Sequence, residues 1–86
     1  MGFDNTASST SSSAIGNGNT AVGLGALALG TSNETSGSSA TAIGNANKAT
    51  VNQSFAFGYN NTASGVFSMA LGFGSSTTGQ YSTAMG

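Results

Sequence analysis

Small and larger side chains alternate along this chain, and the alternation restarts every 14 residues. In Ser68-Met69-Ala70-Leu71-Gly72 the small residues interleave with larger ones, which is the period of two expected of a β-strand. The motif recurs at an unbroken spacing of 14 as Ala14-Ile15-Gly16, Ala28-Leu29-Gly30, Ala42-Ile43-Gly44, Ala56-Phe57-Gly58, Ala70-Leu71-Gly72 and Ala84-Met85-Gly86. Met1-Gly2 falls in the same phase, without the alanine. A fixed period of this length indicates a repeat architecture of one stacked unit.

Counting from the residue after each repeat glycine divides the chain into six rows of 14 positions: 3–16, 17–30, 31–44, 45–58, 59–72 and 73–86. Glycine permits tight turns, so the glycines at positions 7 and 14 divide a row into two short arms. A helix is disfavoured, because glycine recurs and no apolar stripe at a spacing of 3.6 persists from row to row. The pattern predicts an all-β solenoid of about six coils with two short strands each. We expect one array over 1–86, as a segment of a longer fibre or as a unit that stacks end to end.

The large residue at position 13 is the predicted core of each coil. Two arms of about five residues at ~3.3 Å per residue leave room for one thin layer of side chains. We expect a core ladder of Ile15, Leu29, Ile43, Phe57, Leu71 and Met85, with turn glycines at Gly16, Gly30, Gly44, Gly58 and Gly72. The alanines of position 12 are then expected to point outward, where another subunit can come close: Ala14, Ala28, Ala42, Ala56, Ala70 and Ala84. Because such a thin core stabilises a monomer weakly, the pattern predicts oligomerisation.

Composition narrows the classes of function. Only 3% of the residues are charged, namely Asp4, Glu34 and Lys48, and the chain has no His and no Cys. We therefore expect neither enzymatic activity nor a bound cofactor or metal. The net charge of −1 gives no basis for binding nucleic acid or an anionic membrane surface. No run approaches the roughly 20 apolar residues of a membrane-spanning helix, so this segment is not expected to insert into a membrane.

The repeat carries a family resemblance. Ser-x-Ala-Ile/Leu-Gly, followed by x-x-Asn/Ala-x-Ala-Thr/Ser-Gly, is similar to the head repeat of trimeric autotransporter adhesins, the YadA-like surface proteins. The resemblance covers all six rows, and residues 58–72 come nearest to the consensus. It implies a left-handed parallel β-roll, a homotrimer around one axis, and attachment of a bacterial cell surface to a host or environmental surface. Similar repeats occur in bacteriophage tail fibres, so a tail-fibre shaft on a virion is one alternative. A self-assembling extracellular filament without a dedicated receptor is another.

Two columns of polar residues are candidate sites. Glu34 and Lys48 occupy position 4 of consecutive rows, which predicts a cross-coil ion pair worth a fraction of a kcal/mol, or a polar contact for a partner. Position 3 carries an asparagine in five rows: Asn5, Asn19, Asn33, Asn47 and Asn61. These residues predict either a ladder of stacked amides or simply a series of turns that favour asparagine.

Exposed aromatic residues are the remaining candidates. Tyr59 and Phe73 share position 1 of consecutive rows, and Phe67 and Tyr81 share position 9. Aromatic side chains that stack along a ladder stabilise it, and exposed ones also suit contact with a receptor or with a neighbouring fibre. Simple packing at the corners of the coil is the alternative.

Overall fold

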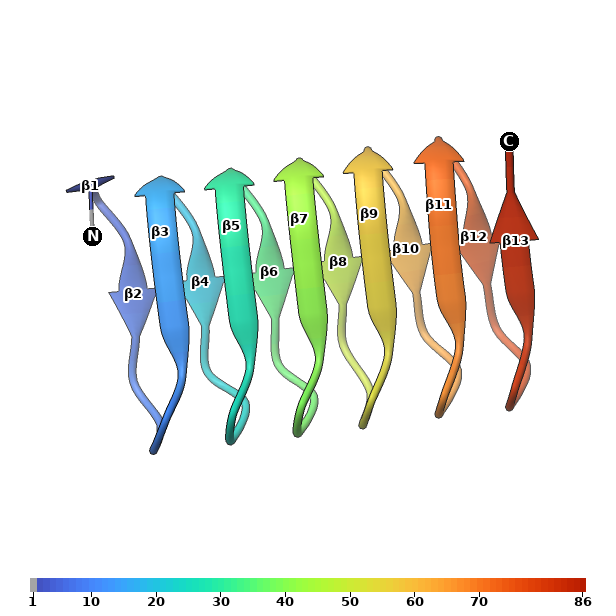
Figure 1. Cartoon of the computed structure of the whole chain (residues 1–86), viewed down its shortest axis with the longest axis horizontal. Helices are drawn as coiled ribbons and strands as arrows, with labels where there is room; N and C mark the ends of the chain where they lie inside the picture. Colours follow the sequence, from blue (N-terminus) through green and yellow to red (C-terminus); the bar gives the residue numbers. More distant parts are fainter. Residues whose placement is uncertain (1) are drawn as a thin grey trace.

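The computed structural model describes residues 2–86, which wind into a flat solenoid with the two termini at opposite ends (Figure 1). Within these residues, the strands form two sheets in which every neighbouring pair is parallel. Partners lie 14 residues apart, as in the pairing of Ile15 with Leu29. The predicted all-β solenoid of about six 14-residue coils is therefore confirmed. The prediction that Met1-Gly2 continues the repeat pattern involves Met1, which lies outside the described residues.

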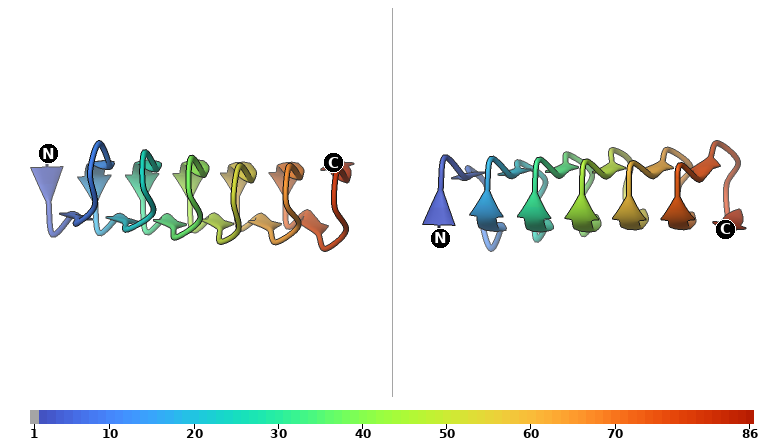
Figure 2. Two further views of the ribbon diagram at one scale, coloured as in Figure 1. Left: turned by 90° about the horizontal axis from the view of Figure 1, so that it is seen from below. Right: turned by 90° about the horizontal axis from the view of Figure 1, so that it is seen from above.

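Each coil contributes one long strand and one short strand. The long-strand sheet has the order β1 (Gly2–Phe3), β3 (Ser13–Asn17), β5 (Leu27–Thr31), β7 (Thr41–Asn45), β9 (Phe55–Tyr59), β11 (Met69–Phe73) and β13 (Thr83–Met85). The short-strand sheet has the order β2 (Thr6–Ala7), β4 (Thr20–Ala21), β6 (Glu34–Thr35), β8 (Lys48–Ala49), β10 (Thr62–Ala63) and β12 (Ser76–Thr77). Figure 2 shows the two sheets as thin layers that run side by side along the array. The Cα atoms extend over 30 × 23 × 10 Å, and the longest extent matches the roughly 29 Å expected of six coils spaced ~4.8 Å apart.

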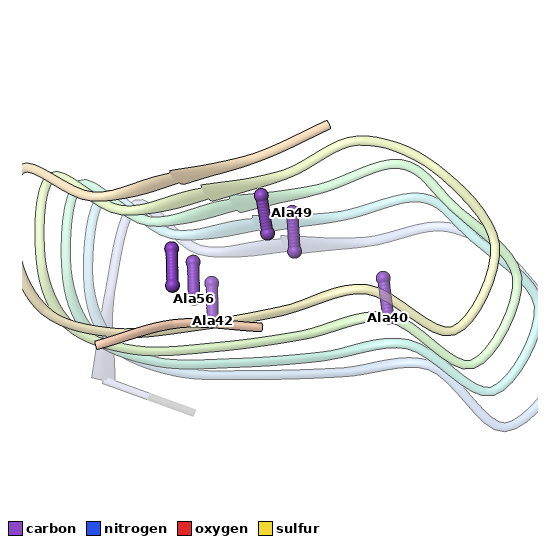
Figure 3. Close-up of a cluster of buried hydrophobic side chains, with 6 residues drawn as sticks. Ala40, Ala42, Ala49 and Ala56 are labelled. Carbon is purple, nitrogen blue, oxygen red and sulfur yellow. The ribbon is translucent and has the colours of Figure 1, made fainter. Parts of the chain in front are cut away.

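The interior of the coil is lined by small side chains, which reverses the predicted orientation of positions 12 and 13. The alanines of position 12 are buried from Ala14 to Ala70, and Ala84 is half-buried. In Figure 3, Ala42 and Ala56 lie on one sheet opposite Ala49 on the other, and Ala40 lies farther along the same interior. The predicted core ladder is wrong: Phe57 is 42% and Met85 74% exposed, and the others in that column are exposed or half-buried. For the same reason, the buried alanines cannot be subunit contacts.

The width of the coil explains this reversal. The shortest Cα extent is only 10 Å, and among residues 2–86 the largest fully buried side chains are asparagines. Alternation along a strand requires positions 10 and 12 to share one face and positions 11 and 13 to share the other. Positions 10 and 12 carry only serine and alanine. These side chains are small enough to fit between the two closely spaced sheets, whereas the larger side chains of positions 11 and 13 are not.

A ladder of buried asparagine amides runs along one side of the interior, which confirms the stacked-amide interpretation of position 3. The Nδ2 of Asn33 donates to Oδ1 of Asn19 at 3.0 Å, to the carbonyl oxygen of Leu29 at 2.9 Å and to that of Gly44 at 2.9 Å. Its own Oδ1 accepts from the backbone N–H and the amide of Asn47, both at 3.0 Å. Each such side chain therefore joins three consecutive coils. A buried polar group is tolerated only when it is satisfied in this way.

The predicted turn glycines do not lie in turns: Gly16, Gly30, Gly44, Gly58 and Gly72 are each the fourth residue of a long strand, with φ between 118° and 126°. At Gly44, a Cβ atom would lie 2.0 Å from the carbonyl oxygen of Gly58 and 2.9 Å from Nδ2 of Asn47. This position therefore excludes every side chain, both through its backbone conformation and through the close approach of the next coil. The tightest bends lie elsewhere, at positions 2 and 9, where residues such as Ala46 and Gln53 adopt φ near 60°.

Candidate functional site: an apolar face and two aromatic edges

The outer side of the long-strand sheet is a continuous apolar surface, here called the apolar face. It consists of the outward side chains of positions 11 and 13. Nine of them are apolar (Ile15, Leu27, Leu29, Ile43, Phe55, Phe57, Met69, Leu71 and Met85) and three are polar (Ser13, Thr41 and Thr83). Every one of them is exposed or half-buried. Contiguous apolar surface of this kind on a soluble protein marks an interaction site.

Aromatic residues dominate the middle of the apolar face. Phe55 and Phe57 project from the same side of β9, with ring centroids 5.9 Å apart and an angle of 48° between the ring planes. Their neighbours on β7 and β11 are Thr41, Ile43, Met69 and Leu71. The coil that contains β9 therefore presents the bulkiest layer of this face.

The outer side of the short-strand sheet is polar. Its positions 4 and 6 carry serine and threonine, together with Glu34, Lys48 and one apolar residue, Val22. Glu34 and Lys48 are directly paired on β6 and β8, as their shared position predicts. No ion pair joins the two side chains in the part of the chain that the structure describes, so the register is confirmed and the predicted ion pair is not formed. The molecule thus has one apolar and one polar face.

The four candidate aromatic residues form two stacked pairs. Tyr59 and Phe73 lie with their ring centroids 4.8 Å apart and an angle of 6° between the planes. Phe67 and Tyr81 lie 5.2 Å apart with an angle of 2°. All four side chains are exposed, between 47% and 73%. The structure therefore shows the stacking and the exposure, whereas contact with a partner stays a prediction.

The two pairs lie on opposite narrow edges of the coil. Each long strand ends at position 1, and the bend that leads to the short strand follows at positions 2 and 3; positions 7 to 9 form the bend that leads back. Tyr59 and Phe73 are the last residues of β9 and β11, next to the first bend, and this side of the coil is here called the first edge. Phe67 and Tyr81 belong to the second bend, here called the second edge. The apolar face lies between the two edges.

The second edge places its aromatic residues in a strained backbone conformation. Phe67 and Tyr81 both have φ of 59°, in the left-handed region. This region costs a residue with a side chain roughly 1–2 kcal/mol, and it is unusual for bulky residues. The same position is occupied by Ser11, Gly25, Ser39 and Gln53 in the other coils. The sequence alone did not reveal this strain, although the glycine and serine residues in the column are a signal for a left-handed bend.

The described residues offer little for other kinds of chemistry. Residues 2–86 contain no pocket and no group of three or more acidic, histidine or cysteine side chains that could hold a metal ion. Across the same span, no helix has the length and apolar character to cross a membrane. The surface features of this part of the chain are therefore the apolar face, the polar face and the two aromatic edges.

Fold and surface together define a repeat protein of the parallel β-solenoid class, with one wide apolar face. The family model described as "YadA head domain repeat (2 copies)" matches residues 1–34, 36–61 and 63–86. The chain therefore belongs to the family of YadA head domain repeats, as its motif indicates. Comparison with curated proteins and with solved structures found no match.

Proposed function

We propose that this chain is an adhesive segment of an extracellular bacterial fibre, in which three copies assemble around one axis with their apolar faces inward. The single observation that carries the assembly is the exposure of the apolar face on a chain whose buried hydrophobic side chains, among residues 2–86, are all alanines. The number of copies is the one that the family implies. Membership in the family of YadA head repeats supports the same arrangement, with left-handed rolls at a cell surface.

The energetics of the single coil favour association. The interior between the sheets buries alanine, serine, threonine and asparagine, so each coil removes little apolar area from water. Hydrophobic stabilisation is roughly 25 cal/mol per Å² of buried apolar surface, and most of the apolar surface of this chain lies on its outside. Assembly through the apolar face would bury that surface and leave the polar face toward water.

Oligomeric mass tests the assembly. Sedimentation equilibrium at micromolar chain concentration is expected to give three times the chain mass of 8.2 kDa. Phe57→Ser, in the centre of the apolar face, is expected to shift the mass toward that of the monomer. Val22→Ser is the matched control, because it removes an exposed apolar side chain from the opposite face. A monomeric parent protein, or equal effects of the two substitutions, would contradict the proposed arrangement.

An adhesive role follows from repetition of weak contacts. Three identical outward surfaces on a rigid segment raise the strength of attachment through avidity, without requiring a deep binding pocket. Beads coated with the trimer are expected to be retained on cultured epithelial cells or on glass more strongly than beads coated with albumin. Beads that carry the Phe57→Ser variant at equal density are expected to lose most of this retention. Equal retention of trimer-coated and albumin-coated beads on both surfaces would refute the adhesive role.

A further inference from the structure

The two aromatic edges lie at the same level of the array. Tyr59 and Phe67 belong to the row 59–72, and Phe73 and Tyr81 belong to the next row. Because the rows stack in register along the whole sheet, the first-edge pair and the second-edge pair occupy the same two coils. They are separated by the width of the flat coil, whose second-longest Cα extent is 23 Å. One chain therefore cannot bring its two aromatic pairs together.

The coil itself does not require aromatic residues at the second edge. Serine occupies the equivalent position at Ser11 and Ser39, with the same left-handed φ of about 60°. Phe67 and Tyr81 adopt this strained conformation and remain largely exposed. Strain that is retained at an exposed position points to a role in contacts beyond the single chain.

We propose that the second edge of each chain contacts the first edge of the next chain, so that the two aromatic pairs meet between protomers. This inference rests on the proposed trimer with inward apolar faces. When three flat coils surround one axis in this way, each corner joins one edge of a chain to the opposite edge of its neighbour. The contact is heterologous, and it closes after three copies because the rotation returns to the first chain.

The surroundings of the two edges suit a contact between copies. Residues 49–86 carry no charged side chain, so this end of the array can be covered without burying a charge, which is costly when unpaired. The cores of protein interfaces are depleted in charged residues and enriched in Tyr, Phe and Met. Both aromatic pairs and Met69 on the apolar face meet this description. The trimer is thus held together by the apolar faces around the axis and, in addition, by aromatic residues at each corner.

Chemical cross-linking tests the pairing of edges, since the chain has no native cysteine. In the variant Tyr59→Cys/Phe67→Cys, a short bismaleimide is expected to produce a covalent trimer as the main product, through covalent dimers. The width of the coil keeps the linker from joining both cysteines of one chain. Tyr59→Cys alone and Phe67→Cys alone are the controls, and neither is expected to cross-link, because each edge faces the opposite edge.

The outcomes separate this inference from the proposed function. A trimer by sedimentation that does not cross-link in the double variant overturns the contact between edges and leaves the trimer standing. Efficient cross-linking of either single variant also overturns it, because like edges would then meet. A protein that is monomeric at micromolar concentration overturns the trimer and, with it, the contact.

A second pair of variants tests the energetic role. Phe67→Ser/Tyr81→Ser introduces the residue that other coils carry at this position, so the fold is expected to remain, as judged by circular dichroism. The chain concentration at which the trimer dissociates is expected to rise at least tenfold. Leu24→Ser, which removes an exposed apolar side chain from the second edge of another coil, is expected to change it by less than threefold. A change below twofold in the double variant would refute the role of the aromatic residues.

Discussion

Removal of one rung of the asparagine ladder should destabilise the fold far more than removal of an exposed amide. Asn47 is fully buried. Its Nδ2 donates to Oδ1 of Asn33 at 3.0 Å and to the carbonyl oxygen of Gly58 at 2.8 Å. Its Oδ1 accepts from the backbone N–H of Asn61 at 3.0 Å. Asn47→Ala removes all of these bonds without changing the backbone.

The magnitude follows from the groups that the substitution leaves unpaired. The backbone N–H of Asn61 and the carbonyl oxygen of Gly58 each lose a hydrogen bond inside the coil. An unsatisfied buried N–H costs about 1–3 kcal/mol and a lost hydrogen bond about 0.5–1.5 kcal/mol, so the two together cost about 1.5–4.5 kcal/mol. Total stabilities of small domains are roughly 5–15 kcal/mol, and the variant therefore loses a large share of its stability.

The chain itself supplies a graded comparison. At the same position of the last row, Ser75 places its Oγ 2.9 Å from the carbonyl oxygen of Leu71 and 2.8 Å from that of Gly86. A serine hydroxyl thus reaches both carbonyl groups that the asparagine amide reaches, but it does not continue the amide ladder. Asn47→Ser is expected to lose about half as much stability as Asn47→Ala.

Urea unfolding at one fixed chain concentration, followed by circular dichroism, measures these losses, because the stability of an oligomer depends on concentration. Asn45→Ala is the matched control, since it removes an exposed amide from the same coil and should change the stability by less than about 0.5 kcal/mol. A loss for Asn47→Ala that is no larger than for Asn45→Ala would refute a stabilising ladder.

Three further expectations concern the geometry of the coil. Gly44→Ala should abolish folding, because its Cβ would lie 2.0 Å from a carbonyl oxygen. Gly74 has open space around it, so Gly74→Ala should cost only about 1–2 kcal/mol for its left-handed φ. Comparable thermal stability of the two variants would contradict this expectation. Ala56→Leu should destabilise the fold by about 1–3 kcal/mol or more through overpacking, and a neutral effect in urea unfolding would mean that the interior is wider than observed. A double-mutant cycle on Glu34 and Lys48 should give a coupling below about 0.5 kcal/mol, because Lys48 is exposed, Glu34 is half-buried and the two form no ion pair. A larger value would show that the side chains do pair.

Much of the fold was predictable from local rules. The 14-residue period predicted the coils, and the alternation of side-chain size predicted strands that pair in register, as Glu34 and Lys48 do. The repeated asparagine predicted an amide ladder as one of two alternatives, because a polar column in a repeat either stacks or lies in the turns. The columns also predicted the two stacked aromatic pairs, since identical positions of consecutive coils are neighbours.

The orientation of the strands was decided by the tertiary structure. Alternation with a period of two is satisfied equally well whether the large residue or the alanine points inward, so Ala56 and Phe57 could exchange sides without changing the pattern. What separates the two cases is the distance between the sheets, which depends on the tight bends and on the asparagine amides that link both strands of a coil. At a Cα extent of 10 Å, the space between the sheets admits alanine and excludes phenylalanine, so the large side chains point outward and form the apolar face.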